Sequence, residues 1–364
     1  MTVHCSYMLL PPKESLHGFM NTITFLMFSG LTLYNFLSAI FEGPGYLPLK
    51  WLPESARDET YLQFCKICQG YKAPRSHHCK KCGRCVLKMD HHCPWINNCV
   101  GHANHAHFTA FLFFSVCGSL QSTVVLSISL YKAIHKAWYI THGYENPIQF
   151  SVAFLVLCVF ALGLAIGVVL AVGMLLFMQV RAIIRNRTGI EDWILDKAMY
   201  RRLPSDPPFI YPYDLGWWKN FIQVINFGFG PIGDGITWPV VEGCTQYTLT
   251  IEQKEQKDEK RARTRPFIVV KPYSGYWFPV IYGWRVCSHP PLTDEPRIAL
   301  HCSEMVYVTR WRKYWLFGEK AFEGDDSRRI RGWFPRCCVV EVEQCKSSSG
   351  EVDGLMSKSN KKNQ

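Results

Sequence analysis

Three long apolar runs dominate the pattern of hydrophobic and polar positions along this chain of 364 residues. They cover residues 19–41, 108–134 and 150–180, and neither the first nor the third contains a charged side chain. At 1.5 Å per residue, each run makes a helix long enough to cross a hydrocarbon layer of about 30 Å. Glu42-Gly43-Pro44-Gly45 ends the first run abruptly, as expected at a membrane surface. The pattern therefore favours membrane-spanning helices over buried helices of a soluble protein.

Positive charge is distributed unevenly between the segments that connect these runs. Nine Lys or Arg residues lie between positions 42 and 107, and Arg181, Arg185 and Arg187 directly follow the third run. The loop at 135–149 is short and nearly free of them. Because Lys and Arg accumulate on the cytoplasmic side of a membrane, residues 42–107 and everything beyond 180 are expected in the cytosol. The loop at 135–149 and the N-terminal segment 1–18 then lie on the opposite, lumenal side.

Cysteine and histidine are concentrated between positions 65 and 99. This stretch holds seven of the sixteen cysteines and four of the thirteen histidines, in C-x2-C and H-C-x2-C-x2-C spacings. Thiolates two residues apart on a tight turn can occupy two corners of a zinc tetrahedron. Disulfides would remove these ligands, so the pattern indicates a reducing compartment. Residues 42–107 are expected to form a zinc-binding domain.

The number of candidate ligands separates structure from chemistry. Two tetrahedral ions need eight donors, whereas the stretch offers eleven, so three are left over. Two candidates, His91 and Cys93, lie in the tetrapeptide Asp90-His91-His92-Cys93. A free thiol beside an imidazole and a carboxylate has the composition of a nucleophile, its base and the group that orients the base. Spacing alone leaves open which cysteine is free.

The stretch resembles the cysteine-rich domain of the DHHC family of protein S-acyltransferases, including Pro94-Trp95, Asn98-Cys99, Gly101, Asn104 and Phe108 after the tetrapeptide. The resemblance implies two structural zinc ions, a Cys93 nucleophile, a His91 base and an Asp90 that orients it. It also implies palmitoyl-CoA as the acyl donor, and membrane-associated proteins with cytosolic cysteines as acceptors. The implied ligand sets are Cys65, Cys68, His78 and Cys85 for one zinc, and Cys79, Cys82, His92 and Cys99 for the other.

The chain departs from this family at two places. Family members usually have four or more spans, and the three runs here match the last three of that core, so the first helix is absent from this pattern. Thr188-Gly189-Ile190-Glu191 resembles the family's T-T-x-E motif, with Gly189 in place of the second threonine. The hydroxyl that would reach toward Asp90 is therefore missing, while Thr188 and Glu191 are retained. In the cytosolic element 181–249, Asp214-x-Gly216-x3-Asn220 resembles a further family motif, in which Asn220 has a supporting role.

The C-terminal third is predicted to form a separate small domain. Residues 250–265 are polar and of mixed charge, as in a solvated helix or linker. Residues 266–342 alternate short β-prone pieces with turns, and Gly332-Trp333-Phe334-Pro335 begins an ending that resembles an SH3 domain. An SH3-like barrel that binds a partner is expected. Cys337 and Cys338 are adjacent in the expected closing strand, so one of them should point outward; with Cys345 they are candidate S-acylation sites.

The tail at 343–364 is expected to be disordered, and Lys361 and Lys362 resemble a K-K-x-x retrieval signal. The chain as a whole resembles an SH3-bearing endoplasmic-reticulum member of the family: an α-helical polytopic membrane protein with a cytosolic two-zinc domain and a C-terminal SH3-like β-barrel. A non-catalytic zinc-containing adaptor is the alternative, but it leaves the grouping of Cys93, His91 and Asp90 unexplained. The net charge of +11 also allows a nucleic-acid-binding finger that uses Lys80, Lys81, Arg84 and Lys88, which three flanking spans disfavour.

Overall fold

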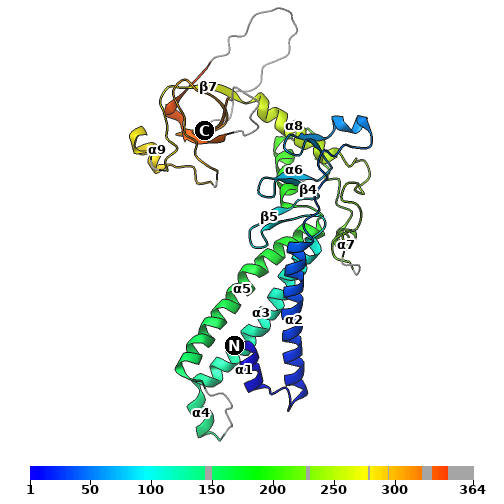
Figure 1. Cartoon of the computed structure of the whole chain (residues 1–364), viewed down its shortest axis with the longest axis vertical. Helices are drawn as coiled ribbons and strands as arrows, with labels where there is room; N and C mark the ends of the chain where they lie inside the picture. The colour runs from blue at the N-terminus through cyan, green and yellow to red at the C-terminus, as the bar shows by residue number, and fades with distance from the viewer. Residues whose placement is uncertain (144–149, 227–229, 278, 294, 322–329, 343–364) are drawn as a thin grey trace, which may run out of the picture. The chain divides into compact units, whose positions relative to one another are not determined.

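The computed structural model describes residues 1–143, 150–226, 230–277, 279–293, 295–321 and 330–342. The chain divides into two compact units, Met1–Gln256 and Lys257–Gln364. The first unit contains the long helices and the cysteine-rich segment, and the second contains a small sheet (Figure 1). Cys345, Lys361 and Lys362 lie outside the described residues, as does the predicted disordered tail.

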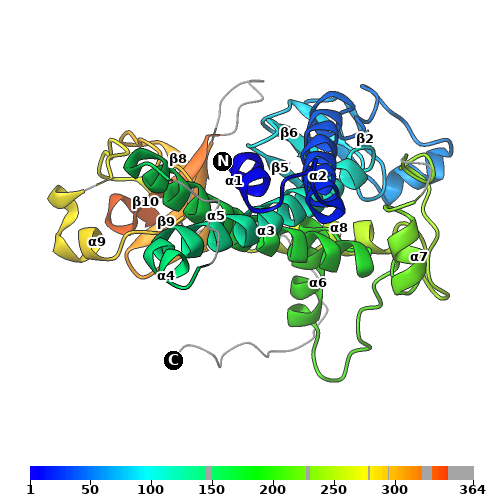
Figure 2. The same ribbon diagram turned by 90° about the horizontal axis from the view of Figure 1, so that it is seen from below.

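Three long helices run side by side in the first unit (Figure 1): α2 (Leu16–Phe41), α3 (His105–Ile134) and α5 (Val152–Ile184). All three are long and apolar enough to cross a membrane, and their apolar side chains are largely exposed in the protein alone. Figure 2, a view from below, shows α3 between α2 and α5, and α3 packs against both. The chain is a multi-pass membrane protein, with each helix a few residues longer than its predicted run.

Polar side chains join the helices of this bundle. Gln121 of α3 donates to Asn21 of α2 over 2.8 Å, and the His107 ring is hydrogen bonded to Asn35 Oδ1 over 2.9 Å. A short N-terminal helix, α1 (Thr2–Leu9), packs against α2 and α3, and α4 (Lys136–Thr141) follows α3. Such pairs satisfy groups that would otherwise lack hydrogen-bond partners in lipid.

The cysteine-rich segment lies at one end of the helices and consists of three antiparallel hairpins (Figure 1). They follow a short 3₁₀ turn, η1 (Ala56–Thr60). The strands are β1 (Gln63–Cys65) with β2 (Gly70–Lys72), β3 (His77–Cys79) with β4 (Arg84–Val86), and β5 (His91–Cys93) with β6 (Asn98–Val100). Strands of three residues cannot bury a core of their own. That these short hairpins are nevertheless folded is consistent with stabilisation by metal ligation.

After α5 the chain returns to this cysteine-rich segment. Helix α6 (Gly189–Arg201) is followed by α7 (Trp217–Ile222) and α8 (Thr248–Ala262). Ile194, Tyr211, Tyr213, Trp238 and Leu249 form the apolar core of this part of the unit. Glu252 of α8 is buried and pairs with Arg201 and Arg202, so the beginning of the predicted solvated linker is part of the packed first unit.

The second unit contains a five-stranded antiparallel sheet in the order β10-β9-β8-β7-β11. Its strands are β7 (Arg265–Val269), β8 (Met305–Trp311), β9 (Trp315–Lys320), β10 (Arg331–Pro335) and β11 (Val339–Glu341). Trp315, Trp333 and Phe334 are fully buried in its core. Between β7 and β8 come the turn η2 (Val280–Tyr282) and the helix α9 (Trp284–Ser288). The coarse prediction of a small β domain is therefore correct.

The adjacent cysteines of this unit lie in a different element from the one predicted. Cys337 and Cys338 belong to a 3₁₀ turn, η3 (Arg336–Cys338), rather than to the closing strand, which begins at Val339. Cys338 is buried in the core, whereas Cys337 is exposed. The turn therefore produces the same division into one inward and one outward thiol that strand alternation would have produced.

Candidate functional site

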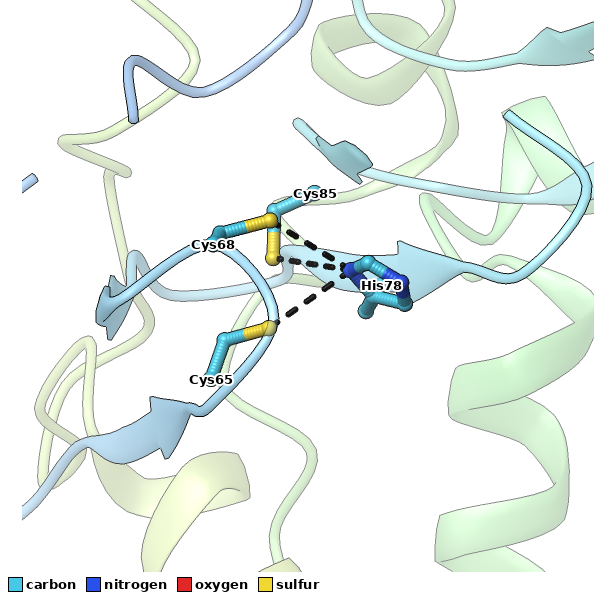
Figure 3. A group of neighbouring side chains, drawn as sticks. All are labelled: Cys65, Cys68, His78 and Cys85. Atoms are coloured by element: carbon cyan, nitrogen blue, oxygen red, sulfur yellow. Dashed lines mark hydrogen bonds between the residues drawn. The ribbon is translucent and has the colours of Figure 1, made fainter. Parts of the chain in front are cut away.

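Two groups of four side chains could each hold a zinc ion. The first comprises Cys65, Cys68, His78 and Cys85, with the three Sγ atoms 3.5, 3.4 and 3.9 Å from His78 Nδ1 (Figure 3). Ligands at zinc-to-sulfur and zinc-to-nitrogen distances of about 2.0–2.3 Å form a tetrahedron with edges of roughly 3.5–3.8 Å. The spacing of these atoms fits a zinc ion at the centre.

The second group, Cys79, Cys82, His92 and Cys99, repeats this geometry. Its Sγ atoms lie 3.6, 3.4 and 3.7 Å from His92 Nδ1. All four donor atoms lie within 4.8 Å of one another, and the residues are buried or half-buried. The structure therefore brings together both ligand sets that the family resemblance implied.

Strand alternation explains why neighbouring residues belong to different groups. His78 and Cys79 are consecutive in β3, so their side chains point to opposite faces and belong to the first and second groups. The same rule applies in β5, where His92 belongs to the second group. His91 and Cys93 flank it on the other face of the strand. The period of two thus separates a zinc ligand from the two side chains expected to carry out the chemistry.

Asp90, His91 and Cys93 form a connected set. His91 Nδ1 donates a 2.8 Å hydrogen bond to Asp90 Oδ2, which leaves Nε2 as the ring nitrogen available to the Cys93 sulfur. Cys93 is buried in an apolar cluster with Ile96 and Phe108, and this cluster includes residues of all three long helices. The thiol thus lies where the zinc-binding segment meets the membrane-spanning bundle, and an acyl chain could approach it from the bilayer.

The electrostatics of this set favour a charged thiolate and imidazolium. Burial alone would raise the pKa of the Cys93 thiol, but the hydrogen bonds from His91 and from the backbone N–H groups of Ile96 and Trp95 lower it. Burial opposes charge on His91 as well, yet its hydrogen bonds with Asp90 and Cys93 raise its pKa to about 9. The shifts have the directions required of an activated cysteine nucleophile.

The carboxylate of Asp90 is fixed by three donors. Besides His91, Gln179 of α5 donates to Oδ2 over 3.1 Å, and the backbone N–H of Gly189 donates to Oδ1 over 2.8 Å. Burial would raise the pKa of Asp90, but the His91 hydrogen bond, nearby histidine charge and the Gly189 N–H hold it far below its ordinary value. Asp90 is therefore ionised and held in one orientation.

Gln179 was not anticipated from the sequence. Its amide oxygen is hydrogen bonded to the His105 ring over 2.9 Å, so it links α3 and α5 to the carboxylate. Together with Ser151, it is one of two polar side chains in the third apolar run, where a polar residue usually has a functional partner. That signal could have identified it.

Thr188 and Glu191 form the N-terminal cap of α6. Thr188 Oγ1 accepts a hydrogen bond from the Glu191 N–H, while the Glu191 carboxylate accepts one from the Thr188 N–H, which makes a capping box. Gly189, the first helical residue, thereby has its N–H directed at Asp90. The cap thus connects the retained part of the motif to Asp90.

A fully buried ion pair attaches this cap to the zinc-binding segment. Arg75 donates to both carboxylate oxygens of Glu191, over 2.6 and 2.7 Å, and also to the backbone carbonyl of Asn186. Its guanidinium lies 4.4 Å from the ring centre of Tyr213 and 4.6 Å from that of Trp238. The sequence offered Arg75 only as one of many basic residues, because its partner is 116 positions away.

Asn220 occupies a structural position at the end of α5. It is fully buried, donates to the backbone carbonyl of Ile184 at the end of α5, and donates to Asp214 Oδ1 over 2.7 Å. It fastens α7 to the end of the third span.

Lys88 does not belong to a surface that could meet nucleic acid. Its side chain is buried, and its ammonium lies 5.3 Å from the ring centre of Trp238. A lysine in this position cannot contact phosphates of a polynucleotide in solvent.

Comparison with known proteins identifies the class. The family model described as DHHC palmitoyltransferase matches residues 58–196, which contain both ligand groups and the Asp90–Cys93 tetrapeptide. Palmitoyltransferase PFA4 of Mycosarcoma maydis is 34% identical over 250 residues, 58% of this chain and 50% of the fungal protein. The chain belongs to the DHHC palmitoyltransferase family and is a protein S-palmitoyltransferase.

More specific similarity extends over nearly the whole chain. It is 47% identical to Palmitoyltransferase ZDHHC6 of Danio rerio over 354 residues, covering 92% of this chain and 85% of the zebrafish protein. The corresponding protein of Homo sapiens is 45% identical, with 92% and 84% covered. The predicted enzyme class is confirmed, and the non-catalytic adaptor is disfavoured.

Proposed function

We propose that the enzyme transfers a long-chain acyl group in two steps through a thioester on Cys93. The observation that carries this proposal is the position of Cys93, which shares a strand face with His91 and lies in an apolar cluster with residues of the three spans. Acyl-CoA is the donor, and cysteines of membrane-associated proteins are the acceptors. A thioester intermediate keeps the bond class unchanged and separates two substrates that arrive from different phases.

In the first step, the Cys93 thiolate attacks the carbonyl carbon of the acyl-CoA thioester. The carbon–sulfur bond to CoA breaks, and the departing CoA thiolate takes the proton from His91 Nε2. In the second step, His91 removes the proton of the acceptor thiol, which attacks the Cys93 thioester and releases Cys93 as a thiolate. Asp90 holds the ring through Nδ1 in both steps, in the manner of a Cys-His-Asp triad.

The two ligand groups have structural roles in this proposal. Four ligands each leave no open position, so bound zinc would tie the hairpins together rather than take part in the transfer. The β5 strand, which carries both His92 and Cys93, would then have its orientation fixed from the zinc side. Thr188, Glu191 and Asn220 would support the site through α6 and α7.

A single-turnover assay with the purified enzyme and labelled palmitoyl-CoA tests this proposal. Wild-type protein should acquire one hydroxylamine-labile acyl group at Cys93, and Cys93→Ser should acquire none at this position. Acylation of a partner by the Cys93→Ser protein at the wild-type rate would refute the assignment.

We further propose that the enzyme resides in the endoplasmic reticulum with its C-terminus in the cytosol. The support is the excess of Lys and Arg in residues 42–107 and after the third span, together with Lys361-Lys362 near the end. Changing both lysines to serine should let the protein advance to the Golgi with unchanged transfer activity. An unchanged distribution would assign the retention to the spans instead.

The sheet of the second unit is proposed to be an SH3-like barrel that recruits a partner. Its support is the five-strand antiparallel order and the β10-η3-β11 ending. A solution structure of this unit with an open sheet would contradict the barrel.

Cys337 is proposed as an S-acylation site because it is exposed. Cys345 is proposed as a second site. Cys338 is buried, and burial raises the pKa of its thiol. Mass-tag exchange after hydroxylamine, position by position, tests all three.

A further inference from the structure

The segment between β7 and β8 presents an unusual number of apolar side chains to solvent. Tyr276, Trp277, Val280, Ile281 and Trp284 are all exposed, and together we call them the aromatic patch. Ile281 is 94% exposed and Trp284 is 82% exposed, so neither side chain contributes to the core of the second unit. In Figure 1 the segment (yellow, labelled α9) lies outside the sheet of the second unit.

The exposure of the aromatic patch is imposed by the fold around it. Tyr282 packs against the core and donates to the Pro272 carbonyl, and Val286 is the buried residue of α9. The Val286 carbonyl also accepts a 3.1 Å hydrogen bond from Trp315 Nε1. Because Tyr282 and Val286 point inward, their neighbours Ile281 and Trp284 must point away from the core.

Trp277 is held in place by a charged neighbour. The Arg297 guanidinium lies 3.8 Å from the Trp277 ring centre, and Arg297 also donates to the Trp277 backbone carbonyl over 3.2 Å. A side chain stacked in this way does not have to be ordered when it binds, so the conformational cost of binding is reduced. Trp277 is therefore preorganised for binding.

Positive charge borders the aromatic patch, and the segment itself carries no acidic residue. No Asp or Glu occurs between positions 265 and 293, whereas Arg285 lies within α9 and is exposed. Arg312 and Lys313 line a neighbouring groove with Leu292 and His289. Exposed Trp and Tyr together with Lys and Arg are typical of a surface that enters the headgroup layer of an anionic membrane.

We propose that the aromatic patch docks the second unit onto the surface of an anionic lipid bilayer. The chain crosses a membrane three times, so this unit is permanently tethered to a bilayer. Ile281 and Trp284 would enter the headgroup and acyl boundary, and Arg285, Arg312 and Lys313 would meet lipid phosphates. Docking would restrict the second unit to the membrane surface on which acyl transfer takes place.

Site-specific photo-crosslinking in the full-length enzyme tests this docking. A benzophenone amino acid replaces Ile281 in one protein and Val340 in a control, since Val340 is also an exposed aliphatic residue of the second unit but belongs to β11. Each protein is reconstituted in vesicles of phosphatidylcholine with phosphatidylserine. Unchanged palmitoyl transfer would verify that both proteins fold.

The docking account predicts several-fold more lipid adduct at position 281 than at position 340. It also predicts that Arg285→Glu combined with Lys313→Glu reduces the adduct at position 281 several-fold. Equal or negligible lipid adducts at the two positions would overturn the proposal. In membranes isolated from cells, a protein adduct at position 281 in place of the lipid adduct would also overturn it, because the patch would then be a protein-docking surface.

Discussion

The backbone N–H of Gly189 lies 2.8 Å from Oδ1 of Asp90 and donates a hydrogen bond to it. The related T-T-x-E motif has a threonine here, whose hydroxyl this chain lacks. Because Gly189 is the first residue of α6, its N–H is one that the helix leaves unpaired. The carboxylate is thus held by the main chain, and its orientation depends on the cap formed by Thr188 and Glu191.

This relationship predicts that Gly189→Pro slows acylation of Cys93. Proline fits the first position of a helix, and Thr188, with φ −73° and ψ 160°, already has a conformation that a following proline permits. The substitution removes the N–H donor with little effect on α6, but its Cδ takes the place of the N–H hydrogen and would collide with Oδ1, so the Asp90 carboxylate must also shift. Loss of this charge-assisted hydrogen bond together with that shift should lower the single-turnover rate by about 10-fold or more.

Gly189→Ala provides the matched control. It keeps the N–H, and its Cβ would lie 3.8 Å from Asp90 Oδ1, an ordinary contact distance. Its acylation rate should stay close to wild type. Equal rates for the proline and alanine variants would mean that this hydrogen bond does not matter for the reaction.

Removal of one partner from the buried pair of Arg75 and Glu191 should destabilise the protein strongly. Removal of either partner leaves the other as a buried, uncompensated charge, which typically costs about 3–5 kcal/mol. Arg75→Ala and Glu191→Ala should each lower the apparent melting temperature in detergent micelles. The double variant should lose much less than the sum of the two, and additive losses in this cycle would contradict the direct coupling.

Lys88 provides a pH-dependent prediction. Burial and the nearby Arg75 charge lower its pKa to about 7, whereas the unfolded chain has the ordinary value of about 10.4. Between these values the unfolded state binds more protons, so the Lys88 contribution makes the free energy of unfolding rise with pH. Below pH 7 the full penalty for burying the charge is present.

Lys88→Met should therefore stabilise the protein at pH 6–7, by an amount of order a few kcal/mol at most. This gain should shrink as the pH is raised toward 9.5. Thermal unfolding of both proteins at several pH values checks the sign. A gain that stays constant or grows with pH would contradict the lowered pKa.

The ligand assignment predicts opposite outcomes for two adjacent histidines. His78→Ala removes a member of the first group, so the protein should lose the zinc ion bound there. The hairpins should then unfold, because a structural zinc site contributes about 10 kcal/mol of folding free energy. His77→Ala should keep both ions. Metal analysis of the purified proteins distinguishes the two, and loss of zinc from His77→Ala alone would shift the assignment by one position.

The parts of this structure that could be predicted from the sequence are those encoded by local patterns. The apolar runs predicted α2, α3 and α5 within a few residues, and the Cys and His spacing predicted a zinc domain. The choice of Cys93 as the free thiol came from the resemblance to a family, because spacing does not distinguish equivalent thiols.

Contacts between distant segments could not be predicted in this way. Nothing near Arg75 in the sequence indicates that it pairs with Glu191, and nothing near Gly189 indicates that its N–H meets Asp90. Both contacts depend on how α6 packs against the hairpins. Cys337 and Cys338 show a smaller failure of the same kind, since β-prone residues formed a 3₁₀ turn where the chain passes from β10 to β11.

The most direct test of the two-step account is a chase experiment on the isolated acyl-enzyme. The enzyme is acylated with labelled palmitoyl-CoA, freed of CoA and unreacted donor, and then mixed with a membrane-associated acceptor protein. The account predicts that label leaves Cys93 and appears on an acceptor cysteine in equal amount, with no further donor present. Label that stays on Cys93 while the acceptor is acylated only when fresh palmitoyl-CoA is added would contradict it.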